Sequence, residues 1–268
     1  MPGSPSPQSG IKLGVIAVVA VTIGFALLFV FGPASTTNSD QIAEPTSSFR
    51  VTEVLDDAET RAALAALAKV APATLAELNT AAAFAHAEGA DQQTVAQLTM
   101  EALFSQFQDQ ALALRSARSE DYQAIIAGFA SGLSELKANQ SPWCEGPTIA
   151  AYLTQNDDRL VPSLLQEFPY GSPQYKWAMG WMTTILQAVD AGQRNPNRHP
   201  RPGFRDETIL QQEGLALGSE QWALALQIAA FANAEGTSYA QMQDVIAGMD
   251  VCDLGVAIET VSGRLPTD

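Results

Sequence analysis

The chain has 268 residues, 47% of them hydrophobic and only 16% charged, and its formal net charge at pH 7 is −15. This composition is typical of a packed globular protein and excludes a disordered acidic tail. The excess of carboxylates disfavours binding to nucleic acid, whose phosphates they would repel, and general adhesion to anionic lipid.

The first distinct segment, residues 11–31, is almost entirely apolar. A helix rises 1.5 Å per residue, so about 20 residues cross the roughly 30 Å hydrocarbon core of a bilayer. Lys12 lies at the start of this segment, and the first charges beyond it are the acidic Asp40 and Glu44. By the positive-inside rule, we expect residues 1–10 to be cytoplasmic, the apolar segment to be a single-pass transmembrane anchor, and the remainder to lie outside the cytoplasm.

An alternative is a signal peptide that is cleaved near Ala34, which would release the protein into the periplasm. The apolar run exceeds the usual length of a signal-peptide core, which favours the uncleaved anchor. Residues 32–48 are rich in Thr, Ser, Asn and Pro and predict a flexible stalk. From the alanine-rich, acidic composition we expect a bacterial-type inner membrane and a periplasmic domain.

Beyond the stalk, residues 49–268 show a helical periodicity of apolar side chains that predicts an all-α, multi-helix domain. Asp57 is placed to cap the first helix, Pro72 to begin the second and Gly89 to end it, and Asp91 to cap the third. The expected helices cover about 58–71, 72–88, 92–114, 119–137, 147–155, 161–167, 174–190, 206–217, 219–235, 238–249 and 252–262.

An alanine-rich octapeptide at the end of the second expected helix returns 147 positions later with seven of eight identities. The two copies are residues 82–89 and 229–236. The register extends across the following turn, which predicts a duplicated helical hairpin with related halves at about 57–104 and 204–251. In each copy, we expect the phenylalanine, Phe84 or Phe231, to pack into the core.

Two cysteines, Cys144 and Cys252, are the only ones in the chain. In an exported domain they are free to form a disulfide, which would join the middle of the chain to its end. Their spacing excludes CxxC redox chemistry, so we expect a structural disulfide; the alternative is two buried thiols.

No catalytic motif is recognisable in the chain. His86 and His199 are the only histidines, which excludes a multi-histidine metal site, and HExxH, GxSxG, Walker and GxGxxG patterns are absent. His86 and Glu88 lie two residues apart near a helix end and therefore point in different directions. We expect no catalytic residue, no cofactor and no metal.

Two segments are candidates for binding a partner. The first is aromatic and contains Tyr170, Tyr175, Trp177 and Trp181. The two tryptophans are four residues apart and share a helix face, which is more typical of a core than of a ligand platform. The two tyrosines flank a Gly-Ser-Pro turn, so we expect them to be exposed and suited to a protein interface or a sugar.

The second candidate is a proline-rich loop, residues 193–205, with Arg194, Arg198, Arg201 and Arg205. It holds four of the 13 basic residues that follow the apolar segment. A long loop of this kind is often functional. It either binds an anionic partner or pairs with the acidic surface of its own domain, and exposed pairs of that kind contribute little.

These features favour a non-enzymatic, membrane-anchored accessory or scaffold subunit of an envelope complex. Its partner would be a membrane or periplasmic protein. One alternative is an exported hydrolase of envelope polymers, such as peptidoglycan, that uses a carboxylate as its acid. Such enzymes carry a Glu-Ser pair and, nearby, a segment that resembles Gly-Leu-Met-Gln. This chain has no Glu-Ser pair, and it has Gly-Leu-Ala-Leu-Gly at residues 214–218, which departs from the second pattern. The other alternative is a small-ligand binding module in which Trp177 and Trp181 line a cleft.

Overall fold

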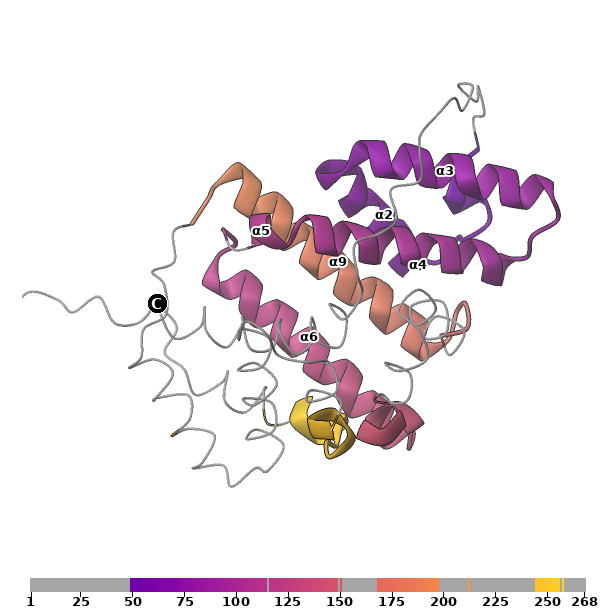
Figure 1. Cartoon of the computed structure of the whole chain (residues 1–268). Helices are drawn as coiled ribbons and strands as arrows, with labels where there is room; N and C mark the ends of the chain where they lie inside the picture. Colours follow the sequence, from indigo (N-terminus) through magenta and orange to yellow (C-terminus); the bar gives the residue numbers. More distant parts are fainter. Residues whose placement is uncertain are drawn as a thin grey trace, which may run out of the picture.

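The computed structural model describes residues 49–114, 116–148, 150, 168–197, 212, 244–255 and 257. This part of the chain is all-helical, with α-helices, two 3-10 helices and no strand (Figure 1). The expected anchor, residues 11–31, and the expected stalk, residues 32–48, lie outside the described residues. Within the described part, none of the helices combines the length and the apolar character that a membrane crossing requires.

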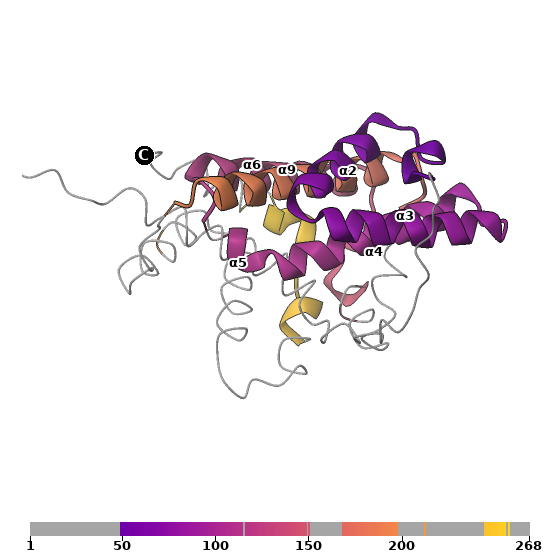
Figure 2. The ribbon, with the colours of Figure 1, turned by 90° about the horizontal axis from the view of Figure 1, so that it is seen from above.

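The helices form two layers. Figure 2 shows α2 (Ala58–Val70), α6 (Ser119–Ala138) and α9 (Pro173–Arg194) in one layer, and α3 (Pro72–Ala87), α4 (Gln92–Asp109) and α5 (Ala111–Leu114) in the other. Helix α9 is central, because it packs along α2 and α6 within its own layer and also contacts α4 and α5. The core therefore surrounds α9 and consists of side chains that are almost fully buried.

The first helices begin at the residues that the sequence predicts, and α2 and α3 end one residue before the expected positions. Asp57 caps α2, because its carboxylate accepts a 2.7 Å hydrogen bond from the amide of Thr60. Pro72 is the first residue of α3, and Gly89 follows its end with φ of +89°, a left-handed conformation that glycine adopts without steric cost. Asp91 then caps α4 through a 2.8 Å hydrogen bond from the amide of Thr94.

The third expected helix is divided into two. Helix α4 ends at Asp109 and α5 begins at Ala111, with a turn at Gln110 between them. The helical path still continues through the turn, because the amide of Gln110 donates to Gln106 O at 2.9 Å and the amide of Leu114 donates to Gln110 O at 3.0 Å. The chain is therefore helical on both sides of Gln110 and as far as Leu114, as expected, but the expectation of one uninterrupted helix is wrong.

The N-terminal end of the described chain is fixed on α3. The short 3-10 helix η1 (Val51–Glu53) contacts α3, and the amide of Val51 donates to Asn79 Oδ1 at 3.0 Å. The ring of Phe49 stacks on His86, with centroids 5.5 Å apart. Because Val51 and Leu55 are fully buried, this entry segment is part of the core.

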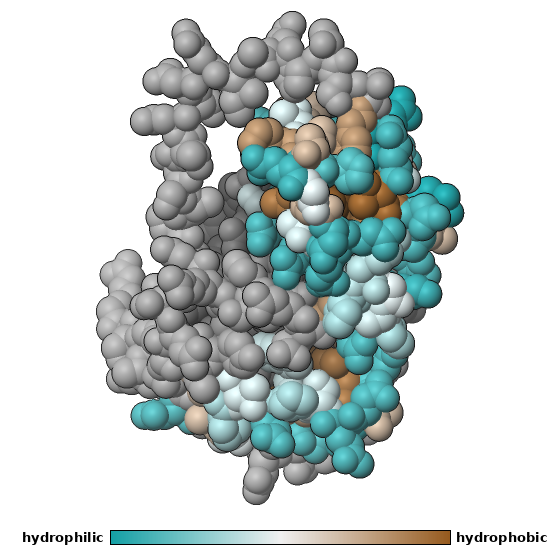
Figure 3. Space-filling view, turned by 90° about the vertical axis from the view of Figure 1, so that its right-hand side faces the viewer, coloured by the Kyte–Doolittle hydropathy of each residue, from teal (hydrophilic) through white to brown (hydrophobic). Residues whose placement is uncertain are grey.

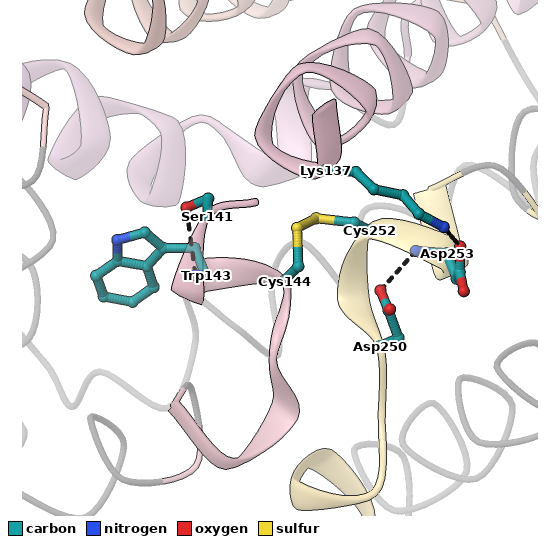
Figure 4. Close-up of a disulfide and its surroundings, with 7 residues drawn as sticks. All are labelled: Lys137, Ser141, Trp143, Cys144, Asp250, Cys252 and Asp253. Atoms are coloured by element: carbon teal, nitrogen blue, oxygen red, sulfur yellow. Dashed lines mark hydrogen bonds and ion pairs between the residues drawn. A yellow bond between two sulfur atoms is a disulfide. The ribbon is translucent and has the colours of Figure 1, made fainter. Parts of the chain in front are cut away.

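The C-terminal segment is held against the end of α6 by a disulfide between Cys144 and Cys252 (Figure 4). Cys144 belongs to the 3-10 helix η2 (Pro142–Cys144), which follows α6, and the two Cα atoms are 4.9 Å apart. Lys137 of α6 forms an ion pair with Asp253 beside this bond. The expected structural disulfide is confirmed.

Further contacts surround the disulfide. The amide of Gly146 donates to Met249 O at 2.8 Å, and Glu145 and Asp250 form an isolated antiparallel bridge. The backbone is helical at residues 244–247 and 251–255, within or beside the helices expected at 238–249 and 252–262. The helices expected at 161–167, 206–217 and 219–235 lie outside the described residues, apart from residue 212.

One expectation about the core is wrong. Phe84 is 65% exposed and does not pack into the core. The buried residues of α3 are Leu78 and Ala82, and Phe84 lies two residues from Ala82, on the opposite side of the helix. The second copy of the octapeptide, residues 229–236, lies outside the described part, so the duplication stays a prediction.

Candidate functional site

The aromatic segment belongs mainly to the core. Tyr175 is fully buried, which corrects the expectation that it is exposed. Its hydroxyl lies 2.7 Å from Thr60 Oγ1 of α2, and burial raises the pKa of its phenol. The physical reason is the start of α9: Ser172 caps the helix by accepting from the amide of Tyr175, so Tyr175 already lies in the first helical turn and faces α2.

Tyr170 is half-buried and links three segments. Its amide donates to Gln93 Oε1 of α4 at 2.7 Å, and its hydroxyl accepts from the amide of Asp56 at 3.2 Å. Its ring packs edge-to-face on Tyr175, with centroids 5.3 Å apart. Burial, together with the nearby Asp57 carboxylate, raises the pKa of the Tyr170 phenol. This tyrosine therefore holds the turn before α9 against α4 and the segment before α2, and only part of its surface is accessible.

Trp177 and Trp181 lie in the contact between α9 and α6. Their rings are stacked, with centroids 5.9 Å apart and planes 7° from parallel. The indole N–H of Trp177 donates to Gly128 O at 2.8 Å, and that of Trp181 donates to Ile125 O at 3.0 Å. Trp181 is therefore buried in the core, and Trp177 is partly buried and packs against it.

Further rings pack on the two tryptophans. Phe168 stacks on Trp177 at 6.4 Å, and Phe129 packs on Trp181 at 5.4 Å. A sugar-binding platform needs an aromatic face that is open to its ligand. Here the two indoles contact each other, two phenylalanine rings and the backbone of α6. Their main role is therefore to join α9 to α6.

The described part of the arginine loop is its beginning. Arg194 ends α9 and is exposed, and its guanidinium pairs with Asp190 one turn earlier in the same helix. The amide of Asn197 donates to Ser116 O at 2.9 Å, which fixes the start of the loop beside the turn between α5 and α6. Arg198, Arg201 and Arg205 lie outside the described residues. Of the two alternatives, an anionic partner or an acidic residue of its own domain, the structure shows the second for Arg194.

The titratable groups of the described part do not assemble into a catalytic or metal-binding cluster. No group of three His, Cys, Asp or Glu side chains there could hold a metal ion. His86 and Glu88 are both exposed. Glu101 of α4 is half-buried, and burial raises the pKa of its carboxyl. A raised pKa is a property of general acids, but a general acid must also lie within hydrogen-bond reach of the group that it protonates in a bound substrate.

The surface that the sequence did not predict is the outer face of α3. Among the described residues, Phe84 is the large hydrophobic side chain that is exposed to solvent. Exposed alanines extend this face along the helix, at Ala73, Ala76, Ala81 and Ala87. Figure 3 looks onto the side where the α3–α4 hairpin turns and shows apolar residues set among hydrophilic ones. The outer face of α3 therefore exposes Phe84 and several alanines to solvent.

A signal for this face is present in the sequence. Leu75, Leu78 and Ala82 follow the 3–4 spacing of a buried stripe, and Phe84 does not fit that spacing. Its mismatch with the stripe predicts exposure, whereas its size and apolar character suggest burial.

No protein-family model, no curated protein and no solved structure matches the chain.

Proposed function

We propose that the protein is a non-enzymatic accessory or scaffold subunit of an envelope membrane complex, anchored by residues 11–31 and binding a protein partner through a helical surface. The observation that carries this proposal is the exposed outer face of α3, with Phe84 at its centre. Burying a phenylalanine side chain is worth about 1.5–3 kcal/mol relative to leaving it in water. A partner that covers Phe84 gains this free energy, which the isolated domain forgoes.

The construction of α3 also suits a binding surface. The Phe49–His86 stack and the hydrogen bond from the amide of Val51 to Asn79 hold the helix from its other side. A surface that is already ordered loses little conformational entropy when a partner binds. The described polar groups, in contrast, provide no nucleophile, base and stabilising donor in one place, which favours binding over catalysis.

Co-purification of the full chain from native membranes in a mild detergent tests this function. We expect the chain to migrate with a larger complex, and Phe84→Asp to release it, because a carboxylate cannot enter an apolar pocket without a large desolvation cost. Ala127→Asp is the matched control, since Ala127 is exposed on α6, away from α3. Migration of the native chain alone, or equal behaviour of the two variants, contradicts the proposal.

The arginine loop remains a second predicted contact of the same complex. If it binds an anionic partner, Arg198→Glu combined with Arg201→Glu should abolish co-purification through charge repulsion. If this double variant retains every partner, the loop does not bind an anionic partner and instead pairs with its own acidic domain.

A further inference from the structure

Phe84 lies on a strip of α3 whose charged side chains are all acidic. Glu77 precedes it by seven residues and Glu88 follows it by four, so both lie on the same side of the helix as Phe84. Both carboxylates are exposed, and neither takes part in the ion pairs of the described part of the chain. The strip is thus an apolar centre with a carboxylate on either side.

No basic side chain of α3 neutralises these two carboxylates. The helix contains neither lysine nor arginine, and its histidine, His86, is stacked on Phe49. Arg50 follows Phe49 on the side of α3 that η1 occupies, and that side also carries Asn79 and is opposite Phe84. The exposed strip therefore combines an apolar group with a local negative charge.

From this we infer that the outer face of α3 docks a protein partner that offers an apolar pocket for Phe84 with lysine or arginine side chains on the rim of that pocket. This inference rests on the proposed function and specifies the chemistry of the partner. Charge complementarity favours this occupant over two others. A second copy that docks through the same face of α3 would bring carboxylates against carboxylates, and an anionic membrane would repel them.

Site-specific photo-crosslinking in native membranes tests the occupant. A benzoylphenylalanine replaces Phe84 in the full chain, and the yield and mass of its adducts are measured. Glu77→Gln with Glu88→Gln removes two negative charges. Ser134→Lys with Gln187→Lys is the matched control, because it changes the net charge by the same amount at exposed positions of α6 and α9.

We expect one protein adduct whose crosslinked peptide holds basic residues beside apolar ones. Its yield should fall about 3–10-fold in the double glutamine variant and stay unchanged in the control, because charges at the rim of an interface add modestly to affinity and association rate. Raising the salt from about 0.05 to about 0.5 M should lower the yield of the native chain and affect the double glutamine variant less.

Other outcomes overturn the inference in distinguishable ways. An adduct of twice the chain's mass would show that a second copy covers α3, and an adduct with lipid alone would show a membrane contact. Equal yields in the two double variants would remove the role of the carboxylates. In each of these cases the chain can still co-purify with a complex, whereas the absence of both co-purification and adduct also refutes the proposed function.

Discussion

At the scale of single residues, a hydrogen bond between two buried hydroxyls links α2 to α9. Thr60 and Tyr175 are both fully buried, and their oxygens lie 2.7 Å apart. Neither hydroxyl can exchange this partner for water without opening the core. The pair therefore fixes the register of two helices whose sequence positions are more than 100 residues apart.

The two hydroxyls of this pair should be energetically coupled. We expect Tyr175→Phe to lower the free energy of unfolding by about 1–2 kcal/mol, because the Thr60 hydroxyl loses its buried partner. Thr60→Val should have a similar effect, and the double variant should lose less than the sum of the two. Urea unfolding of all four proteins measures this coupling, and strictly additive losses would show that the hydroxyls do not interact.

Glu101 gives a pH dependence of opposite sign to the usual one for carboxylates. Burial raises its pKa in the folded state, so its favourable contribution is complete below the ordinary value of 4.5 and is lost as the pH rises through the folded pKa. At pH 7, Glu101→Gln should therefore be more stable than the native chain. We expect a gain of about 0.5 kcal/mol or less, since the carboxyl is only half-buried and solvent screens it. Thermal unfolding at pH 4 and pH 7 should show the gain only at pH 7.

Tyr175 also shows where inference from sequence reaches its limit at this scale. A Gly-Ser-Pro turn predicts exposure of the residues around it. Whether a residue just after the turn is exposed depends on which face the new helix directs to its neighbours, and that face is set by tertiary packing. The first turn of α9 directs Tyr175 to α2, so its neighbours decide its burial.

At the scale of elements, the contact between α6 and α9 depends on a missing side chain. Gly132 of α6 lies directly under the indole of Trp177, and a Cβ atom there would overlap the ring. Gly128, one turn earlier, would bring a Cβ to 3.1 Å from Trp181 Cδ1, which is a tight contact. Two glycines four residues apart on α6 thus accept two tryptophans four residues apart on α9.

Replacing glycines in these two helices should have opposite effects. We expect Gly132→Ala to destabilise the domain by about 1–3 kcal/mol, because Trp177 must leave its position and its hydrogen bond to Gly128 O. Gly180→Ala on α9 is the control, since the added Cβ would meet no atom within 4 Å beyond the local backbone of its own helix. There, the higher helix propensity of alanine should stabilise by about 0.5–1 kcal/mol. Melting temperatures would separate the two, and a stabilising Gly132→Ala would contradict the close contact.

The bounds of most elements could be predicted because local chemistry determines them. Caps and prolines at Asp57, Pro72 and Asp91 are recognised from sequence, and the helices begin there in the structure. The turn at Gln110 could not be predicted, because neither glycine nor proline marks it. The outward direction of Phe84 is harder to predict, because alanines surround most of α3 and only the 3–4 spacing of Leu75, Leu78 and Ala82 identifies its buried side.

At the scale of the whole molecule, the disulfide links residues separated by 108 positions. Closing so long a loop in the unfolded chain lowers its entropy by an amount worth about 4–5 kcal/mol in the chain-entropy model. We expect Cys144→Ser combined with Cys252→Ser to lower the free energy of unfolding by about 2–5 kcal/mol. Urea unfolding with and without reductant measures this, and reductant should not change the stability of the double variant. A native chain that is insensitive to reductant would contradict the expected contribution.

The same bond has a consequence for proteolysis. Every peptide bond between Cys144 and Cys252 lies inside the covalent loop that the disulfide closes. A protease that cleaves the arginine loop once would therefore leave a nicked molecule whose two fragments stay joined and separate only after reduction. In such a molecule α9 stays on the N-terminal fragment, and the disulfide keeps the C-terminal fragment attached to it, so a cut at this loop would not separate the C-terminal segment from the anchor proposed at residues 11–31.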